Sequence, residues 1–164
     1  MLQVLTFLLF VASALFTWRG LGLLLNLDTP VVVVISESME PAFQRGDLLV
    51  LSMWSRPISV GDICVYKRRS DPSGIPIVHR IVHTHKGPNG KRMMLTKGDN
   101  NPGNDRGLYD AGQQWLEEDD IVGRVAGHLP YVGMFTILLN DYPVLKFVML
   151  GLVGLSVLVT PSES

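Results

Sequence analysis

The chain has 164 residues, of which 47% are hydrophobic, and its formal net charge at pH 7 is −1. This near-neutral balance, without a basic face to neutralise phosphates, argues against nucleic-acid binding. The single cysteine excludes an intrachain disulfide. No phosphate-binding glycine loop or paired metal-ligand motif is present, so we expect no cofactor. The length suits one soluble domain, and the positive mean hydropathy of +0.27 indicates that part of the chain lies in lipid.

The first predicted element is a long apolar helix near the N-terminus. The segment Leu2 to Leu25 carries a single charge, at Arg19. At about 1.5 Å per residue, it is long enough to cross a hydrocarbon core of roughly 30 Å. A cleavable signal peptide is the alternative, because Ala12-Ser13-Ala14 resembles a cleavage site. No basic residue precedes the apolar run, and the run continues past that site, so we predict a retained transmembrane anchor over residues 1–26.

The next part of the chain, residues 27–142, is predicted to be a β-rich domain. Short branched or apolar runs have the length of strands, and Gly, Pro and Asn residues between them are typical of turns. The runs cover residues 31–35, 47–51, 62–66, 75–84, 92–96 and 121–126. No segment shows a helical repeat of comparable strength, so we predict a mainly β fold.

A pair of serines follows the first of these runs. The run is entirely β-branched, which favours a buried, extended strand; its members are Val31, Val32, Val33, Val34 and Ile35. The motif Ser36-Glu37-Ser38-Met39-Glu40-Pro41 comes next, and a proline cannot continue a strand ladder. Ser38 is therefore expected on a bend, where its hydroxyl could be a nucleophile and its N–H could bind an oxyanion together with Ser36. The alternative is that these serines simply end the strand, because serine is common in turns.

Three histidines lie in the run that follows residue 75. Strand alternation would place His79, His83 and His85 on one face, together with Ile81. This spacing could hold a metal, but a further ligand is missing and the lone Cys64 has no thiol partner, so we expect no metal site. His79 fits better as a general base, because an imidazole titrates near neutral pH.

The segment from Lys97 to Gly107 offers two carboxylates, Asp99 and Asp105. Its Gly, Asn and Pro content predicts a loop, and loops on a rigid scaffold often carry catalytic residues. Asp and Asn also fill turns through local hydrogen bonds. From residue types alone, either aspartate could be the third member of a catalytic triad.

A second apolar segment, Val144 to Thr160, lies between Pro143 and Pro161 near the C-terminus. Its length is at the lower limit for a membrane span, so it either crosses the bilayer or only dips into it. We predict a short apolar membrane-associated helix and a tail over residues 143–164.

Taken in order, these motifs resemble those of type I signal peptidases, in their endoplasmic-reticulum branch. The match covers nearly the whole chain and includes the serine motif with Arg45-Gly46-Asp47, Val78-His79-Arg80, Lys97-Gly98-Asp99-Asn100-Asn101, Asn104-Asp105 and Ile121-Val122-Gly123-Arg124-Val125. A lysine occupies the position of His79 in the bacterial branch. The histidine therefore separates the chain from the bacterial branch and places it with the eukaryotic enzymes, with the related archaeal enzymes as the alternative. The resemblance implies a signal-peptidase-like β-rich catalytic domain.

The resemblance also implies roles for individual residues. Ser38 matches the nucleophile, His79 the general base and Asp105 the triad acid, while Asp99 matches a supporting or alternative acid. Ser36 aligns with a residue that contributes to the oxyanion hole with Ser38.

One position departs from the family pattern. Glu37 stands where many relatives have glycine. A carboxylate aimed at the nucleophile would oppose a developing oxyanion, so we expect Glu37 to point to solvent.

The implied function is removal of signal peptides from secretory and membrane preproteins by a membrane-bound serine endopeptidase. The substrate would add as a strand beside residues 31–35. Expected partners are preproteins, small membrane accessory subunits and the lipid bilayer, with no nucleic acid. The implied location is the endoplasmic reticulum membrane, single-pass, with the catalytic domain in the lumen.

Two other kinds of protein remain as alternatives. One is a non-catalytic membrane-anchored subunit of a protein complex, against which the presence of nucleophile, base and acids argues. The other is a self-cleaving repressor-type protease, which would use a lysine base and need no membrane anchor.

Overall fold

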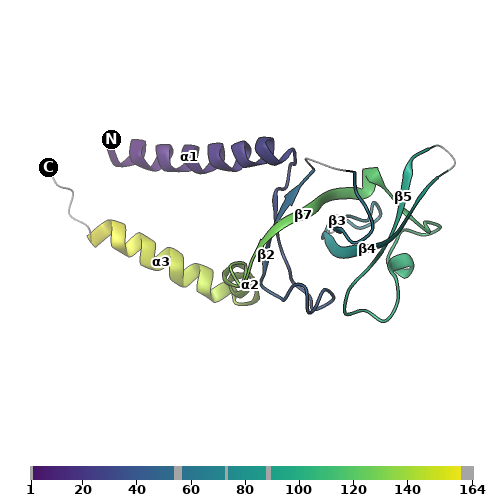
Figure 1. The fold of residues 1–164 in the computed structure, drawn as a ribbon. Helices are drawn as coiled ribbons and strands as arrows, with labels where there is room; N and C mark the ends of the chain where they lie inside the picture. The colour runs from purple at the N-terminus through teal and green to yellow at the C-terminus, as the bar shows by residue number, and fades with distance from the viewer. Residues whose placement is uncertain (1, 54–56, 73, 88–89, 160–164) are drawn as a thin grey trace.

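The computed structural model describes residues 2–53, 57–72, 74–87 and 90–159 (Figure 1). It contains a seven-stranded antiparallel sheet with helix α1 (Leu2–Leu25) before it and helices α2 (Met134–Asp141) and α3 (Pro143–Val159) after it. The strands are β1 (Val31–Val33), β2 (Leu48–Ser52), β3 (Ile63–Tyr66), β4 (Ile77–Lys86), β5 (Arg92–Lys97), β6 (Leu116–Glu117) and β7 (Ile121–Leu129). Short 3-10 helices are η1 (Asp105–Gly107) and η2 (Glu118–Asp120). The predicted mainly β fold with an apolar helix at each end is confirmed.

The sheet brings the last strand into its middle. Its order is β1-β2-β7-β3-β4-β5-β6, so β7 separates β2 from β3 and pairs with both. Buried residues form two clusters. One contains Met39, Leu49 and Leu51, and the other contains Tyr66 and Ile81. The second cluster includes residues of β3 and of β4, the strand that carries His79.

Each of the six predicted runs forms a strand, although the first strand is shorter than predicted. It ends at Val33, so Val34 and Ile35 lie outside it. The Val34 N–H still donates to the carbonyl of Asp47 at 2.9 Å. The next partner, Gly46, has a left-handed φ of 97°, which turns the partner chain away and stops the ladder.

Besides the two short 3-10 helices, one strand and one helix were not predicted. Strand β6 has only two residues, too few to show a pattern. Helix α2 has eight residues and lies in the part of the chain expected to be β-rich. The loop before α2 meets the loop before β2, where the Gly133 N–H donates to the Gly46 carbonyl at 2.8 Å. This contact between distant segments positions α2.

The apolar helices extend from the sheet on the same side (Figure 1). Residues Val4–Leu25 of α1 are long and apolar enough to cross a membrane. Helices α2 and α3 meet at a bend of 103°. Helix α3 begins at Pro143, one residue before the predicted apolar segment, and the predicted end of that segment, Thr160, lies outside the described residues.

Asp47 links the loop before β2 to the loop before α2. Its side chain accepts hydrogen bonds from the backbone N–H of Gln44 at 3.0 Å and from that of Tyr131 at 3.1 Å. Only 5% of Asp47 is exposed, and its neighbour Arg45 pairs with Asp141 at 2.9 Å. The Arg-Gly-Asp tripeptide is thus held by contacts within the fold.

Replacing Asp47 with alanine is expected to destabilise the fold. Two backbone N–H groups would lose their acceptor, so we expect the free energy of unfolding to fall by about 1–3 kcal/mol. The measurement is the thermal unfolding midpoint of the purified chain in detergent. Asp119→Ala is the control, because its carboxylate pairs with Lys91 on the surface, and it should leave the midpoint nearly unchanged. Equal midpoints for the Asp47 variant and the wild type would contradict this account.

Candidate active site

Ser38 lies in the turn that follows β1. Its neighbour Met39 is 1% exposed and packs in the core with Leu49 and Leu51, and the carbonyl of Met39 accepts from the Phe43 N–H at 3.0 Å. Burial of Met39 therefore anchors the turn, while Ser38 remains half-buried at the surface. A serine held in this way has a fixed position and an accessible hydroxyl.

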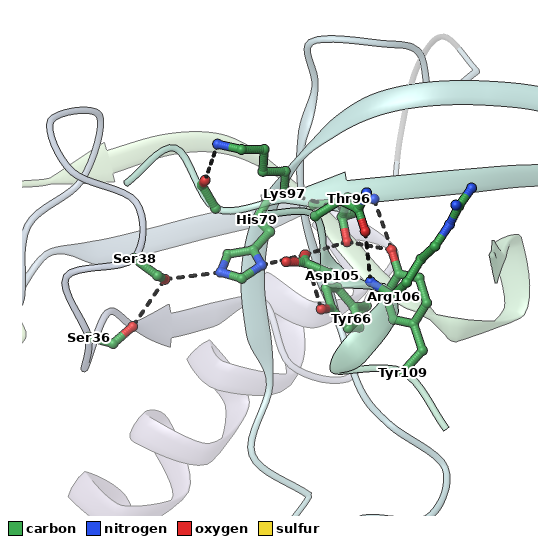
Figure 2. Close-up of polar contacts among 12 residues, drawn as sticks. Ser36, Ser38, Tyr66, His79, Thr96, Lys97, Asp105, Arg106 and Tyr109 are labelled. Carbon is green, nitrogen blue, oxygen red and sulfur yellow. Dashed lines mark hydrogen bonds and ion pairs between the residues drawn. The ribbon is translucent and has the colours of Figure 1, made fainter. Parts of the chain in front are cut away.

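His79 contacts Ser38 on one side and Asp105 on the other (Figure 2). Its Nε2 lies 3.0 Å from the Ser38 Oγ, and its Nδ1 lies 2.5 Å from the Asp105 Oδ2. An ionised carboxylate can only accept, so the Nδ1–H donates to Asp105 and the Nε2 lone pair is left for the serine hydroxyl. The three side chains form a continuous line of hydrogen bonds from the turn after β1 through β4 to η1.

The acid at the end of this line is almost completely buried. Asp105 is 1% exposed, and a buried carboxylate needs several donors to offset its lost hydration. Besides His79, its Oδ2 accepts from the Thr96 hydroxyl at 2.6 Å and from the Tyr66 hydroxyl at 3.3 Å. Asn104 caps η1 by accepting from the Arg106 N–H at 3.3 Å, which fixes the turn that presents Asp105.

Asp99 has a different partner. Arg80 donates to it through Nε at 2.8 Å and through Nη2 at 2.6 Å, and also donates to the Gly61 carbonyl at 3.0 Å. These bonds hold the pKa of the Asp99 carboxyl below its ordinary value. Residue types alone left Asp99 and Asp105 as equal candidates for contact with His79, and the family resemblance implied Asp105. Of the two, the structure places only Asp105 in contact with His79.

The loop that contains Asp99 forms hydrogen bonds with the backbone of the serine turn. The Asn100 N–H donates to the Ser38 carbonyl at 2.9 Å, and its side-chain amide donates to the Glu37 carbonyl at 3.1 Å. Gly98 allows the close approach, because a Cβ there would lie 2.7 Å from the Ser38 carbonyl oxygen. The Arg80–Asp99 ion pair thus holds a loop that in turn holds the backbone of Ser38.

Ser36 and Glu37 are both exposed. The Ser36 Oγ lies 3.2 Å from the Ser38 Oγ, within hydrogen-bonding distance (Figure 2). Glu37 faces solvent, as expected from the sequence.

The predicted shared face of the three strand histidines is wrong. The pairing of β4 with β5 shifts register between Ile81 and His83, and this bulge reverses the alternation beyond it. His79 is buried, whereas His83 and His85 are exposed and pack against Trp115. Among the described residues, no group of three His, Cys, Asp or Glu side chains converges to hold a metal.

Cys64 also lies next to the site, opposite His79 in the pairing of β3 with β4. Burial and the nearby Asp105 raise the pKa of its thiol to about 12. Its Sγ donates to the His79 carbonyl at 3.6 Å. A thiol with this pKa is protonated at neutral pH, so Cys64 is not a second nucleophile.

A cleft of about 290 Å³ opens beside Ser38. The end of β1 and the following residues line one wall, the segment leading into β4 lines another, and Asn101 and Leu108 close it. Strand β1 is the first strand of the sheet order and pairs with β2 alone among the described strands. An extended peptide in this cleft could therefore pair with the outer edge of β1.

Comparison with known proteins identifies the family. Residues 134–159 match the family described as signal peptidase C-terminal short helix. The signal peptidase complex catalytic subunit SEC11C of Homo sapiens is 53% identical over 95% of this chain and 81% of its own length. The corresponding subunits SEC11 of Schizophyllum commune and sec11 of Dictyostelium discoideum are 48% and 49% identical, over 97% and 96% of this chain and 90% and 87% of their own lengths.

The chain belongs to the family of signal peptidase complex catalytic subunits. It is therefore an enzyme, a signal peptidase of the serine type, and α1 anchors it to the membrane.

Three polar neighbours of the site in this signal peptidase were not recognised from the sequence, namely Tyr66, Thr96 and Tyr109. A signal was present for Thr96, because alternation along β5 places it on the same face as the apolar Met94. A threonine on a core face needs a buried partner. Tyr109 lies in a loop, and no local pattern marks it.

We expect Gly98→Ala to impair this signal peptidase. The new methyl group must displace the Ser38 carbonyl or the loop that holds it, and a misplaced serine should cost about 10- to 100-fold in cleavage rate. The measurement is cleavage of a preprotein by the purified complex. Gly103→Ala in the same loop is the control, since a Cβ there meets no atom within 4 Å, and its rate should stay close to wild type. Equal rates for both variants would contradict the close-approach role of Gly98.

Proposed function

We propose that this signal peptidase uses Ser38 as nucleophile, His79 as general base and Asp105 as the orienting acid to cleave signal peptides from secretory and membrane preproteins. The continuous line from the Ser38 Oγ through both ring nitrogens of His79 to the Asp105 Oδ2 supports this proposal above all other observations. Its order of nucleophile, base and carboxylate is the arrangement that acyl transfer by a serine requires.

The reaction follows from these contacts. The Ser38 Oγ attacks the scissile carbonyl carbon while the His79 Nε2 accepts the hydroxyl proton. Asp105 stabilises the imidazolium that forms and holds the ring in place. His79 then gives the proton to the departing amine, leaving an acyl group on Ser38. Water, activated by His79, attacks this ester and releases the second product.

The developing oxyanion has donors within the serine turn. In the described part of the chain, the Ser38 N–H donates to no protein atom, so it is free to bind the oxyanion. The Ser36 hydroxyl lies beside the Ser38 Oγ and supplies a second donor.

Substrate binding uses the outer edge of β1. The main chain of the cleavage region adds as a strand beside residues 31–35, where Val34 and Ile35 continue the edge beyond the regular strand and line the cleft. Alternate side chains of the substrate then point into a cleft bounded by apolar walls and of modest volume, which suits small residues.

The enzyme works at a membrane surface within a complex. Residues 1–26 form the anchor, residues 27–142 the catalytic domain and residues 143–164 a short membrane-associated segment. The location is the endoplasmic reticulum membrane with a single span and the catalytic domain in the lumen. The small accessory membrane subunits and the lipid bilayer contact the two apolar helices, whose side chains over residues 4–19 and 143–152 are mostly exposed in the single chain.

Substitutions test the catalytic roles. Ser38→Ala and His79→Ala in the assembled complex should each lower preprotein cleavage by at least about 1000-fold, and Asp105→Asn should lower it by a similar order because the ring loses its orienting acceptor. Asp99→Asn should retain more activity than Asp105→Asn, since Asp99 does not touch His79. Initial rates and unfolding midpoints are measured for every variant.

His83→Ala is the matched control for His79→Ala, because His83 lies on the same strand and is exposed. It should cleave at close to the wild-type rate. Normal cleavage by a folded Ser38→Ala complex would make the chain a scaffold and place the nucleophile elsewhere. Equal losses for folded Asp99→Asn and Asp105→Asn would remove the distinction between the two acids.

The lumenal placement is testable with one engineered glycosylation site. The sequence contains no Asn-x-Ser/Thr acceptor, and Arg68→Asn creates one with Ser70 on the exposed turn after β3. A lumenal domain should gain an endoglycosidase-sensitive mass on expression in microsomes. The double variant R68N/S70A is the control and should gain none. A catalytic domain on the cytosolic side would leave both variants unmodified.

A further inference from the structure

A closed set of hydrogen bonds lies behind Asp105, on the side away from His79. The backbone N–H of Thr96 lies 2.9 Å from the Tyr109 hydroxyl oxygen, which lies 2.9 Å from the Thr96 Oγ1. The Thr96 Oγ1 in turn lies 2.6 Å from the Asp105 Oδ2 (Figure 2). Thr96 is fully buried and Tyr109 nearly so, so water is not available to replace these partners.

The direction of every bond in this set can be assigned. An ionised carboxylate can only accept, so the Thr96 hydroxyl donates to Asp105. With its hydrogen directed to Asp105, the Thr96 Oγ1 accepts from the Tyr109 hydroxyl, and the Tyr109 oxygen accepts from the Thr96 backbone N–H. Tyr109, held by the backbone of β5, thus keeps the Thr96 hydroxyl in the orientation that donates to the active site.

Tyr109, a member of this set, and Tyr66, which also donates to Asp105, both stay protonated at neutral pH. Burial raises the pKa of Tyr109 and of Tyr66, and the negative charge of Asp105 raises both further. Cys64 on β3 is likewise protonated. The charged neighbours in sequence of Thr96 and Asp105 have other partners. Lys97 donates to the Gly98 carbonyl, and the Arg106 guanidinium lies over the ring of Trp115. Asp99 is bound by Arg80.

We propose that Thr96 and Tyr109 are positioning residues of this signal peptidase, which direct a hydroxyl donor onto Asp105 and so set how strongly Asp105 binds the protonated ring of His79. The proposal rests on the catalytic roles proposed above for Asp105 and His79. The donated hydrogen bond spreads the carboxylate charge. Without this bond more negative charge faces the ring, the imidazolium is stabilised, and His79 becomes a base only at higher pH.

The test is the pH dependence of cleavage by the intact complex. Thr96→Val keeps the side-chain shape but removes the donor, so the midpoint of the acidic limb should move to higher pH by about half a unit or more. Thr96→Ser keeps the hydroxyl and should restore the wild-type midpoint. Tyr109→Phe should move the midpoint in the same direction by less, because the Thr96 hydroxyl is then free to rotate but can still donate.

The double variant T96V/Y109F tests whether Tyr109 acts on Asp105 through Thr96 or independently of it. If Tyr109 acts through Thr96, the double variant should shift no further than Thr96→Val alone. Additive shifts would overturn the proposal, and so would a Thr96→Val enzyme with lower activity at every pH but an unchanged midpoint. Unfolding midpoints measured alongside identify variants that fail to fold, in which case Thr96→Ser and Tyr109→Phe decide the question.

The same experiment distinguishes failure of this inference from failure of the catalytic assignment. An inactive Asp105→Asn enzyme together with a wild-type pH profile for Thr96→Val would remove the positioning role and leave the catalytic role of Asp105 in place. An active Asp105→Asn enzyme would remove both.

Discussion

The buried contact between His79 and Asp105 is the constraint on which the rest of the site depends. Both side chains are almost inaccessible, at 3% and 1% exposure, and the hydrogen bond between them offsets part of the cost of burying two polar groups. The contact joins a strand residue to a loop residue 26 positions later. It therefore requires β4, β5 and the loop after β5 to pack closely. Thr96 and Tyr66 complete the hydrogen bonding of the carboxylate, so the site is assembled by the same burial that builds the core.

Two neighbouring residues of β4, His79 and Arg80, hold different parts of the serine turn. His79 reaches the hydroxyl of Ser38, while Arg80 binds Asp99 and so holds the loop that contacts the Ser38 backbone. One strand thus controls both the side chain and the main chain of the proposed nucleophile. Met39 anchors the same turn from the core. Rigid support on three sides keeps the serine and imidazole in reacting geometry before substrate arrives.

The anchor and the site are close along the chain, which links membrane attachment to activity. Helix α1 ends at Leu25 and β1 begins at Val31, and the Met53 N–H donates to the Leu25 carbonyl at 3.3 Å. Since β1 is also the proposed substrate edge, the cleavage region of a membrane-inserted signal peptide would reach the cleft soon after it leaves the bilayer. Helices α1 and α3 extend from the same side of the sheet, which agrees with a single membrane-facing side (Figure 1).

The sequence by itself determined six of the seven strands, the apolar ends and the family, because β-branched runs, hydrophobic length and ordered motifs are local properties. Residue types alone could not separate Asp99 from Asp105, which occupy the same segment, and only the family resemblance implied Asp105. The tertiary structure places Asp105 against His79 and pairs Asp99 with Arg80. It also decided the faces of His83 and His85, because a bulge depends on pairing with β5. The position of helix α2 and the pairing of Thr96 with Tyr109 depend on contacts between segments that are separate in the sequence. Alternation along β5 indicates that Thr96 faces the core, but no local pattern identifies Tyr109 as its partner, because that contact exists only in the packed structure.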